Sequence, residues 1–430
     1  MLSRIVPYIR WHRRCLSSKA STHLNSDLAK SVFSQFITPS SNKYQQLHPK
    51  PEDEIVIAMS SGVDSSVCAA LYASVFPNVR GIYMANWTQT SRCIEADWKD
   101  VQTVCKQLEI PVERVNFEKE YWHKVFVPML DEYRKGWTPN PDVGCNQHVK
   151  FGVLYDHVMN QDQCQQTRRW LVTGHYSRVM KHLDSNEFHL LRGLYLAKDQ
   201  AYYLAKMPVQ VMDHVLMPMG HLTKPKVREL ASKFGLSTAL KPDLDGLCFV
   251  QQDTKFRDFL AEYLEPNPGN IVTEDGKIWG QHEGLWHATI GQKSGILMPQ
   301  GDDKYKGTWF VSEKNLADNL LVIVRGNKND KLYKNQLVVE NWQWFGSLSP
   351  LELQLNGDQW TQVKDLNVQF RSLQHKSYVD CLKLQRGDDD SVLSIKLMEK
   401  ERAMAPGQTL VLYLNDRIIG SGIIRETQSN

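Results

Sequence analysis

Residues 54–70 read EIVIAMSSGVDSSVCAA, and this stretch decides how the first part of the chain folds. It opens with an apolar, β-branched run at residues 55–59, breaks at Ser60 into small polar residues, and becomes apolar again seven residues later. That order predicts a strand, a tight loop and a helix. The backbone N–H groups of such a loop, at the start of a helix, favour a bound phosphate. Asp64 would repel that phosphate unless a cation lay between them, so it indicates Mg²⁺ held against a polyphosphate.

A capped strand-to-helix turn without a ligand is the alternative, because Ser and Asp favour such turns for their own reasons. The string SSGVDSS at residues 60–66 favours the phosphate, since it resembles the SGGxDS pyrophosphatase loop of ATP enzymes that adenylate a carbonyl oxygen and release pyrophosphate. It is not a Walker loop, because no GK[ST] follows, and transfer of a γ-phosphate is disfavoured. Ser61 stands where that family usually has a second glycine, and its Cβ is expected to narrow the room for phosphate.

Apolar runs alternate with helical patterns from residue 51 to residue 207, which predicts an α/β domain with a Rossmann-like, doubly wound parallel sheet. Besides the strand at 55–59, we expect strands at 79–87, 112–117 and 170–176, and helices at 67–75, 95–108 and 149–159. Such sheets bind their ligands at the carboxyl ends of the strands. The loop at 60–66, residues 84–86 and residues 173–175 all fall at such ends.

Two further domains are expected beyond this sheet, which is itself preceded by a loose lead-in at residues 27–50. Residues 208–268 carry few strand signals and several helical ones, and they predict a small, mostly helical central domain. Residues 269–430 change to short alternating runs separated by turn residues, which predicts a C-terminal all-β barrel or sandwich. The most economical role for that barrel is a lid or a module that contacts RNA.

The first 26 residues, MLSRIVPYIRWHRRCLSSKASTHLNS, stand apart in composition. They are rich in Arg and Ser, contain no acidic residue and place apolar residues between the charges, which is typical of a mitochondrial transit peptide. A basic arm that contacts RNA is the alternative. Removal of the segment would leave 46 Lys and Arg against 48 Asp and Glu, in place of 51 against 48. Binding of nucleic acid by the rest of the chain would then depend on local basic patches.

The overall composition limits the class of protein. Hydrophobic residues make up 42% of the 430 residues and charged residues 23%, as in globular proteins with real cores. No apolar run approaches the roughly 20 residues of a membrane helix, so no membrane association is expected. The eight cysteines include no C-x-x-C pair, which disfavours a zinc ribbon and a secreted disulfide scaffold.

Two cysteines lie in loops that could make them reactive. Cys145 lies in NPDVGCNQHVKFG, residues 140–152, after a Pro-bounded loop and before a helix, with His148 and Lys150 a turn away. Those neighbours would lower the pKa of the thiol and favour a nucleophile. Cys248 lies in DLDGLCFVQQ, again in a Gly-containing loop before an apolar run. Each alone is compatible with a buried structural cysteine, and the spacing does not show that the two meet.

Six motifs follow one another in a recognisable order: SSGVDSS, NPDVGCN with KFG after it, TGHY, KDQAYYL, GLCF and GQKSG. In this order they resemble those of the tRNA-specific 2-thiouridylases, the bacterial MnmA enzymes and their mitochondrial counterparts. The resemblance covers residues 55–424 and leaves out the first 26 residues and insertions such as 161–168. It implies exchange of oxygen for sulfur at C2 of the wobble uridine, at position 34 of tRNA, with ATP and Mg²⁺ as cofactors.

The resemblance also implies which residues bind the nucleotide. Attack of the C2 oxygen on the α-phosphate of ATP would make an O-adenylate and release pyrophosphate, after which AMP can leave. The phosphates would lie on the loop, Asp64 would hold Mg²⁺, and Met84 and Gly174 would neighbour the adenosine. The loop residues in this set are Ala58, Met59, Ser60, Ser61, Gly62, Val63, Asp64 and Ser65.

By the same resemblance, Cys248 would carry a persulfide delivered by a cysteine desulfurase or a sulfur-relay carrier. Cys145 would attack that persulfide or assist its release, and would leave a Cys145–Cys248 disulfide for a reductant to open. No stable cysteine-bound metal is expected. The uracil, flipped out of its stack, would lie among Asn140, Pro141 and Asp142, with Asp142 as acid or base.

Contacts to tRNA are implied for two stretches. They are Lys198, Asp199 and Gln200 of the KDQ motif, and Arg371 and Ser372 in the barrel. A solvated turn is the alternative for KDQ. Ser372 departs from the family's usual aromatic residue, so a stacking contact is expected to be absent there. The substrates would be tRNAs with wobble-uridine anticodons of the Lys, Glu and Gln type, in the mitochondrial matrix.

Three alternatives keep parts of this interpretation. Another tRNA-modifying ligase or amidotransferase would keep the ATP chemistry but use ammonia or an amino acid as the nucleophile, and would need no thiol pair. A non-catalytic tRNA-binding protein would keep the loop without turnover, and only Ser61 favours it. An iron–sulfur cluster on Cys145, Cys248 and another thiol would keep 2-thiolation, but the absence of a third loop cysteine disfavours it.

Overall fold

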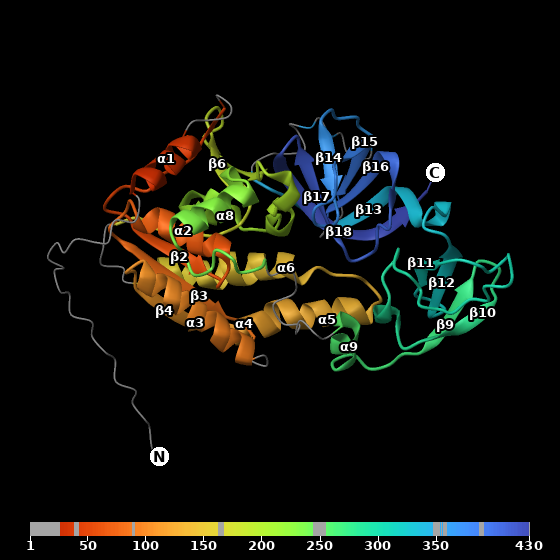
Figure 1. The fold of residues 1–430 in the computed structure, drawn as a ribbon. Coiled ribbons are helices and arrows are strands. Elements are labelled where there is room, and N and C mark those ends of the chain that lie inside the picture. The colour runs from red at the N-terminus through yellow and green to blue at the C-terminus, as the bar shows by residue number, and fades with distance from the viewer. Residues whose placement is uncertain are drawn as a thin grey trace, which may run out of the picture.

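The computed structural model describes residues 26–37, 43–87, 91–161, 167–243, 255–346, 353, 355, 359–386 and 391–429. Within them, a parallel sheet with helices on both faces is followed by a small four-stranded sheet and by a closed β-barrel (Figure 1). The small sheet lies beyond the end of α5 (Val127–Arg134), and the barrel lies beside both other parts. The expected fold class, a Rossmann-like α/β domain with a C-terminal barrel, is confirmed.

The parallel sheet has the strand order β4-β3-β2-β5-β8. Its central strand alternates between two cores, because Ile55 and Ile57 pack into one core and Val56 into the other. A strand that is buried on both faces reads as a continuous apolar run, which is why the sequence predicts it well. The strands are β2 (Glu54–Met59), β3 (Val79–Ala85), β4 (Val112–Asn116), β5 (Arg169–Val172) and β8 (Val215–Leu216).

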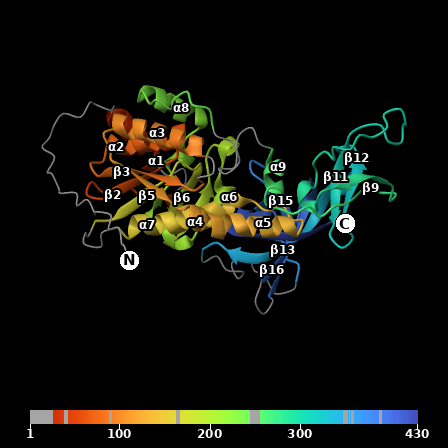
Figure 2. The ribbon, with the colours of Figure 1, turned by 90° about the horizontal axis from the view of Figure 1, so that it is seen from below.

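Two layers of helices cover the faces of this sheet (Figure 2). One layer holds α1 (Ser26–Ile37), α2 (Val63–Ala73), α3 (Ser91–Gln107) and α8 (Lys224–Lys233). The other holds α4 (Glu118–Tyr121), α5, α6 (Pro141–Gly144) and α7 (Tyr155–Met159), with π-helical segments at Trp122–Phe126 and Cys145–Leu154. Residues 215–233, for which the sequence predicts a place in a central domain, complete this sheet and its first helical layer.

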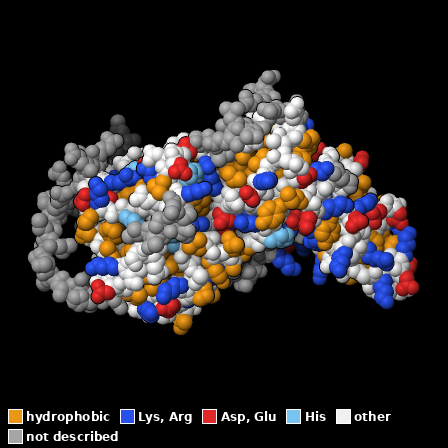
Figure 3. Space-filling model, turned by 90° about the horizontal axis from the view of Figure 1, so that it is seen from above, with side chains coloured by type: hydrophobic (Ala, Val, Ile, Leu, Met, Phe, Trp, Pro, Cys, Tyr) orange, Lys and Arg blue, Asp and Glu red, His pale blue; other side chains and the backbone are white. Residues whose placement is uncertain are grey.

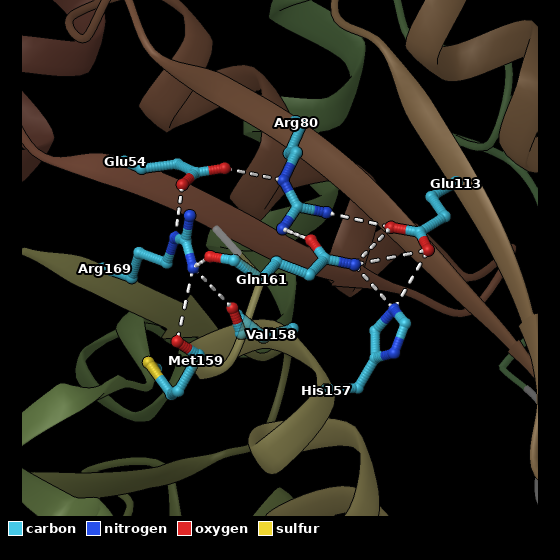
Figure 4. Close-up of polar contacts among 8 residues, drawn as sticks. All are labelled: Glu54, Arg80, Glu113, His157, Val158, Met159, Gln161 and Arg169. Atoms are coloured by element: carbon cyan, nitrogen blue, oxygen red, sulfur yellow. Dashed lines mark hydrogen bonds and ion pairs between the residues drawn. The ribbon is translucent and has the colours of Figure 1, made fainter. Parts of the chain in front are cut away.

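A charged network joins the amino ends of the parallel strands (Figure 4). Glu54, at the start of β2, accepts hydrogen bonds from Arg80 Nε at 2.8 Å and from Arg169 Nε at 2.6 Å. Glu113 of β4 accepts from Arg80 and contacts His157 at 2.9 Å. Burial opposes ionisation of Glu54, but the two arginines more than offset it and lower its pKa. The network therefore fixes the strand starts and leaves the opposite edge of the sheet for ligands.

A hairpin connects the parallel sheet to the barrel. It consists of β6 (Ser177–His182) and β7 (Phe188–Arg192), and β7 pairs with β18 through Leu191 and Arg417. The short β1 (Tyr44–Gln45) pairs with the other side of β6. Pairing of β17 with β18 closes the barrel. Its strands are β13 (Tyr333–Trp344), β14 (Leu366–Gln369), β15 (Ser377–Arg386), β16 (Ser391–Arg402), β17 (Thr409–Leu414) and β18 (Arg417–Gln428).

The small sheet has the order β10-β9-β12-β11 and follows α9 (Phe256–Ala261). Its strands are β9 (Gly269–Thr273), β10 (Ile278–His282), β11 (Trp309–Asn315) and β12 (Leu320–Arg325), so residues 269–430 contain two β-structures. Short 3₁₀ helices occur at Leu196–Lys198, Ala201–Leu204, Val209–His214, Pro218–His221, Leu285–His287 and Asp330–Leu332. In the part of the chain that the structure describes, no helix has the length and apolar character needed to cross a bilayer.

Candidate active site

The phosphate loop lies between β2 and α2, at the carboxyl edge of the parallel sheet. Gly62 precedes the first residue of α2 in an extended conformation. The backbone N–H of Ser60 donates to Ser65 Oγ at 3.1 Å, and Ser66 Oγ donates to the carbonyl of Gly62 at 2.8 Å. Short side chains thus close the loop on itself and hold the amino end of α2, where phosphate is favoured.

Ser61 holds the backbone conformation for which glycine is usual. Its φ is +57°, which costs a residue with a Cβ about 1–2 kcal/mol. The Ser61 hydroxyl donates to Asp97 Oδ1 of α3 at 2.6 Å, and Lys241 Nζ approaches the same hydroxyl at 3.1 Å. A charge-assisted hydrogen bond of this kind offsets the backbone cost. The side chain of Ser61 is therefore tied to α3 and to the residues before the GLCF motif.

Asp64, the predicted Mg²⁺ ligand, is held by two donors. Lys224 Nζ lies 2.8 and 2.9 Å from its two carboxylate oxygens, and the Tyr176 hydroxyl donates to Oδ1 at 2.8 Å. No group of three or more metal-ligating side chains occurs among the described residues. Mg²⁺ is commonly held by one or two carboxylates together with substrate phosphates and water. A single carboxylate at the edge of a phosphate loop fits that mode.

Lys224 also contacts Asp243, the last described residue before the GLCF motif, and so connects it to the phosphate loop. Its Nζ lies 2.9 Å from Asp243 Oδ1, and Lys198 Nζ lies 2.9 Å from Asp243 Oδ2. Arg228 of α8 contacts the same carboxylate at 2.6 Å. Although partial burial opposes it, hydrogen bonds from Lys224 and Lys198 lower the pKa of Asp243 to about 2. Asp243 therefore stays ionised across the physiological pH range.

The two predicted neighbours of the adenosine lie at the expected edge. Gly174 follows β5, and a Cβ built on it would lie 3.1 Å from the backbone nitrogen of Ser65 and 3.2 Å from Asp64 Cβ. Both distances are shorter than an ordinary van der Waals contact, so a side chain here would push the two loops slightly apart. Met84 lies near the end of β3, partly buried against the core. The structure thus brings together the phosphate loop, Gly174 and the carboxyl end of β3.

Cys145 and the predicted uracil-binding residues lie at the junction of two helical segments. Asn140 caps α6 and its Oδ1 accepts from the backbone N–H of Asp142 at 3.1 Å. Cys145 is buried, 4% exposed, and it opens the π-helical segment, a geometry that is frequent at functional sites. Burial raises the pKa of Asp142, although Lys150 opposes the shift. A carboxyl group with a raised pKa suits the predicted role in proton transfer.

A cavity of about 310 Å³ opens beside Asn140 and Pro141. It lies between α5, α6 and the barrel, and residues of β13, β17 and β18 line its other wall. Lys206 also lines it, and burial lowers the pKa of this lysine. Asn140 and Pro141, two of the predicted uracil-binding residues, thus form part of the wall of this cavity.

The loop at residues 136–140, which leads into α6, contacts both the small sheet and the barrel. Lys314 Nζ of β11 donates to the carbonyl of Gly136 at 2.8 Å, and Gly136 has a φ of +78°. The backbone N–H of Thr138 donates to the carbonyl of Pro406 at 2.9 Å. A Cβ on Gly407 would lie 2.6 Å from the nitrogen of Thr138. Residues 136–140 are therefore positioned by the small sheet and by the barrel together.

The predicted tRNA-contacting residues divide into exposed and buried side chains. Lys198 and Arg371 are partly exposed, whereas Asp199 is 3% exposed. The KDQAYYL motif and the Arg371 stretch lie side by side, because the Tyr202 hydroxyl donates to the carbonyls of Phe370 at 3.2 Å and of residue 409 at 3.0 Å. Ser372 follows Arg371 and is also partly exposed.

Cys248 lies outside the described residues, so its adjacency to Cys145 stays a prediction. The described positions on either side of it are both held at the carboxyl edge. Asp243 is tied to Lys224, and Phe259 of α9 packs its ring 6.4 Å from that of Trp87, two residues beyond β3. Asp243 therefore lies beside the phosphate loop, and α9 lies beside the residues that follow β3.

Four residues around the phosphate loop were not singled out in the sequence, and two of them, Tyr176 and Lys224, contact Asp64 directly. Tyr176 is the last letter of the TGHY motif, Lys224 lies in HLTKPKVREL at the start of α8, and Lys241 and Asp243 lie in ALKPDLDG. The available signals were a lysine within the helical pattern of residues 208–268 and an acid–base pair before the second loop cysteine. Neither signal names its partner, because the contacts join residues more than 100 positions apart.

Family models match three successive parts of the chain. They describe a tRNA methyl transferase HUP domain over residues 53–252, a tRNA methyl transferase PRC-barrel domain over 257–325, and an aminomethyltransferase β-barrel domain over 334–424. These ranges follow the parallel sheet, the small sheet and the closed barrel. Among solved structures, NMN synthetase from Francisella tularensis matches 50% of this chain and 74% of its own at 14% identity, with a TM-score of 0.30.

Two curated relatives match almost the whole chain. Mitochondrial tRNA-specific 2-thiouridylase 1 of Saccharomyces cerevisiae is 48% identical over 398 residues, which cover 89% of this chain and 94% of the relative. The tRNA-specific 2-thiouridylase MnmA of Staphylococcus aureus is 38% identical over 380 residues, which cover 87% of this chain and 96% of the relative. Identity of this extent, carried through all three parts of the fold, means that the chain belongs to the tRNA-specific 2-thiouridylase family.

Proposed function

We propose that the protein is an ATP-dependent tRNA-uridine 2-sulfurtransferase that converts the wobble uridine of tRNA to 2-thiouridine, with release of AMP and pyrophosphate. The observation that carries the proposal is the phosphate loop with Asp64 held at its edge, in a chain of this family. The loop has the short side chains and the helix start that a pyrophosphate needs. The segment that opens with Cys145 contacts the KDQAYYL motif, because Asn146 donates to the carbonyl of Tyr203 at 3.1 Å.

The first step activates an oxygen that is otherwise a poor leaving group. The C2 oxygen of the uracil attacks the α-phosphorus of ATP, the bond to the β-phosphate oxygen breaks, and pyrophosphate departs. The amino end of α2 and the ammonium of Lys224 stabilise the charge that develops on the leaving pyrophosphate. Asp64 would hold Mg²⁺, which would supply further charge neutralisation.

The second step replaces the activated oxygen by sulfur. The terminal sulfur of a persulfide on Cys248 attacks C2, and the C2–O bond breaks with release of AMP. The Cys145 thiolate then attacks the Sγ of Cys248, and the electrons of the broken S–S bond stay on the sulfur that is now attached to C2. The products are the thiolated base and a Cys145–Cys248 disulfide, which a reductant reopens. Support comes from Cys145 at the start of the π-helical segment and from the fixed position of Asp243, five residues before Cys248.

The uracil would lie by Asn140, Pro141 and Asp142, beside the cavity of about 310 Å³. When the C2 oxygen forms its bond to phosphorus, the proton on N3 of the ring must leave. An ionised Asp142 can take that proton, and its raised pKa makes its carboxylate a stronger base. Lys198, Arg371 and Ser372 would contact the tRNA. On the face in Figure 3, basic side chains are interspersed with acidic ones, so phosphate contacts would come from local clusters.

The cellular setting follows the family and the first 26 residues. We place the protein in the mitochondrial matrix, because those residues carry Arg and Ser without acids and the yeast relative is a mitochondrial enzyme. The substrates would be tRNAs with wobble uridines of the Lys, Glu and Gln type. Sulfur would come from a cysteine desulfurase or a relay carrier.

Substitution of the two cysteines tests this function. We expect Cys145→Ser and Cys248→Ser to release pyrophosphate from ATP when tRNA is present but to form no 2-thiouridine, because neither acts in the adenylation step. Cys381→Ser, in β15 of the barrel, is the matched control and should retain both activities. The readouts are pyrophosphate release and mass spectrometry of the wobble nucleoside. Full thiolation by Cys248→Ser would remove the persulfide mechanism and favour another nucleophile.

A further inference from the structure

The central residue of the KDQ motif is buried, and the motif has contacts toward both the barrel and the phosphate loop. Asp199 is 3% exposed and its Oδ1 accepts from the backbone N–H groups of Gly193 at 2.9 Å and Ala201 at 3.2 Å. Its other oxygen accepts from Arg192 Nη1 at 3.1 Å. All these partners are protein groups of the same domain. A side chain with this arrangement holds its own backbone and the end of β7 in place.

Arg192, the partner of Asp199, also contacts the barrel. It is 4% exposed, and its guanidinium donates to Asn367 Oδ1 at 3.1 Å and to Gln369 Oε1 at 2.9 Å, both in β14. The guanidinium also lies 3.6 Å from the centre of the Tyr413 ring in β17. Buried charges of this kind are stable only when they are paired and hydrogen-bonded. Asp199 is therefore the counter-charge for the arginine that docks the barrel on the first domain.

Gln200 connects the same motif to the phosphate loop. The side-chain Oε1 of Gln200 accepts from the backbone N–H of Tyr176 at 3.0 Å, and the backbone N–H of Gln200 donates to the carbonyl of Tyr176 at 2.9 Å. Tyr176 is 2% exposed and donates its hydroxyl to Asp64 at 2.8 Å. Two hydrogen bonds thus fix the backbone of a residue whose side chain fixes the predicted Mg²⁺ ligand.

Lys198 gives a second connection to the same carboxylate. It pairs with Asp243, Asp243 pairs with Lys224, and Lys224 contacts both oxygens of Asp64. Starting from one three-residue motif, two chains of contacts therefore end on Asp64. The barrel is attached to the start of both through Arg192.

We propose that Asp199 and Gln200 are positioning residues for the phosphate loop, which set the Asp64 carboxylate relative to the docked barrel. This inference rests on the proposed function, since it assigns Asp64 to the nucleotide. A tRNA held on the barrel would meet an ATP site whose geometry depends on the same docking contacts. Misplacement of a reacting group by about 1 Å costs on the order of 100-fold in rate, so the effect of loosening this linkage is measurable.

The test separates binding of tRNA from turnover. Asp199→Asn and Gln200→Met are assayed for tRNA affinity by fluorescence anisotropy, and for pyrophosphate release at saturating tRNA across a Mg²⁺ titration. We expect the tRNA Kd to stay within about twofold, while release falls by about tenfold or more and half-saturation shifts to higher Mg²⁺. Asp184→Asn is the matched control, because this carboxylate on the same hairpin is exposed and should change nothing.

A weaker tRNA Kd with normal release at saturating tRNA would overturn the inference, and so would parent-like values for both variants. If Asp199→Asn fails to fold, as shown by its circular dichroism, then Gln200→Met and Tyr176→Phe decide. Tyr176→Phe removes only the hydroxyl that holds Asp64, so an unchanged Mg²⁺ titration in this variant would also overturn it. Asp64→Asn distinguishes failure of the proposed function from failure of this inference. Normal pyrophosphate release by Asp64→Asn would refute the proposed function. If Asp64→Asn loses pyrophosphate release while Gln200→Met and Tyr176→Phe behave like the parent, only this inference is refuted.

Discussion

Replacement of Lys314 by Met should be more favourable to stability at neutral pH than at alkaline pH. The Lys314 ammonium is buried between β11 and the loop at Gly136, and burial lowers its pKa from 10.5 to about 7. Between these values the unfolded chain binds more protons than the folded one, so stability rises with pH over that window. The penalty is complete below about pH 7 and has disappeared by about pH 10.5.

The size of this effect follows from the pKa shift. A shift of about 3.5 units at ~1.36 kcal/mol per unit gives an upper limit of about 5 kcal/mol. The residue retains some contact with solvent, which reduces the desolvation, so we expect about 1–3 kcal/mol. Methionine fills a similar volume without a charge, but it leaves the Gly136 carbonyl without its donor, at a cost of about 1 kcal/mol that does not depend on pH.

The quantity to measure is the difference in unfolding free energy between Lys314→Met and the parent, at pH 7 and again at pH 10. Urea titrations of the full chain followed by fluorescence provide it. We expect the variant to gain about 1–3 kcal/mol relative to the parent when the pH is lowered from 10 to 7. Lys331→Met, which removes an exposed lysine paired with Glu274, is the control and should give the same difference at both pH values. An equally pH-independent difference for Lys314→Met would refute the reasoning.

Two further substitutions test the phosphate site. Gly174→Ala places a Cβ 3.1 Å from the backbone of the phosphate loop, and we expect a loss of about 1–3 kcal/mol in stability together with a pyrophosphate-release rate lowered by about tenfold or more. Gly301→Ala, where a Cβ would meet nothing within 4 Å, is its control, and equal losses in both would contradict a local effect. Lys224→Met leaves Asp64 without its ammonium partner beside the phosphates, so the KM for ATP should rise by about tenfold. Lys226→Met, on the same helix, is the control and should leave the KM unchanged. An unchanged KM in Lys224→Met would exclude this lysine from the nucleotide site.

The parallel sheet and its phosphate loop could be predicted from the sequence because their signals are local. The run at residues 55–59 is apolar on both faces, and the switch to small residues at Ser60 lies within the same short stretch. The extent of the first domain was harder to predict. β8 has two residues and joins the sheet through β5, and a strand of this length leaves no alternating pattern. The division of residues 269–430 is also hidden, because alternation reports the face of a strand and not its partner.

The candidate site was predictable to the extent that its residues lie within motifs. The loop, Gly174 and Cys145 all belong to stretches that stand out in the sequence. The partners of Asp64 do not, since Lys224 contacts it across 160 positions and only the fold joins them. The sequence also does not show whether a side chain points inward or outward. The KDQ motif has the composition of a solvated turn, although Asp199 within it is buried. The pairing of Cys145 with Cys248 remains a prediction.

The grip on residues 136–140 has a consequence for how this protein can vary. Lys314 of the small sheet hydrogen-bonds one end of that loop, and the turn at Gly407 packs closely against its middle. The length and path of the loop must therefore fit both β-structures. Removal of either β-structure would take away one of the two contacts that position residues 136–140. We therefore expect a truncated chain that lacks either one to retain the nucleotide-binding fold but to lose 2-thiolation.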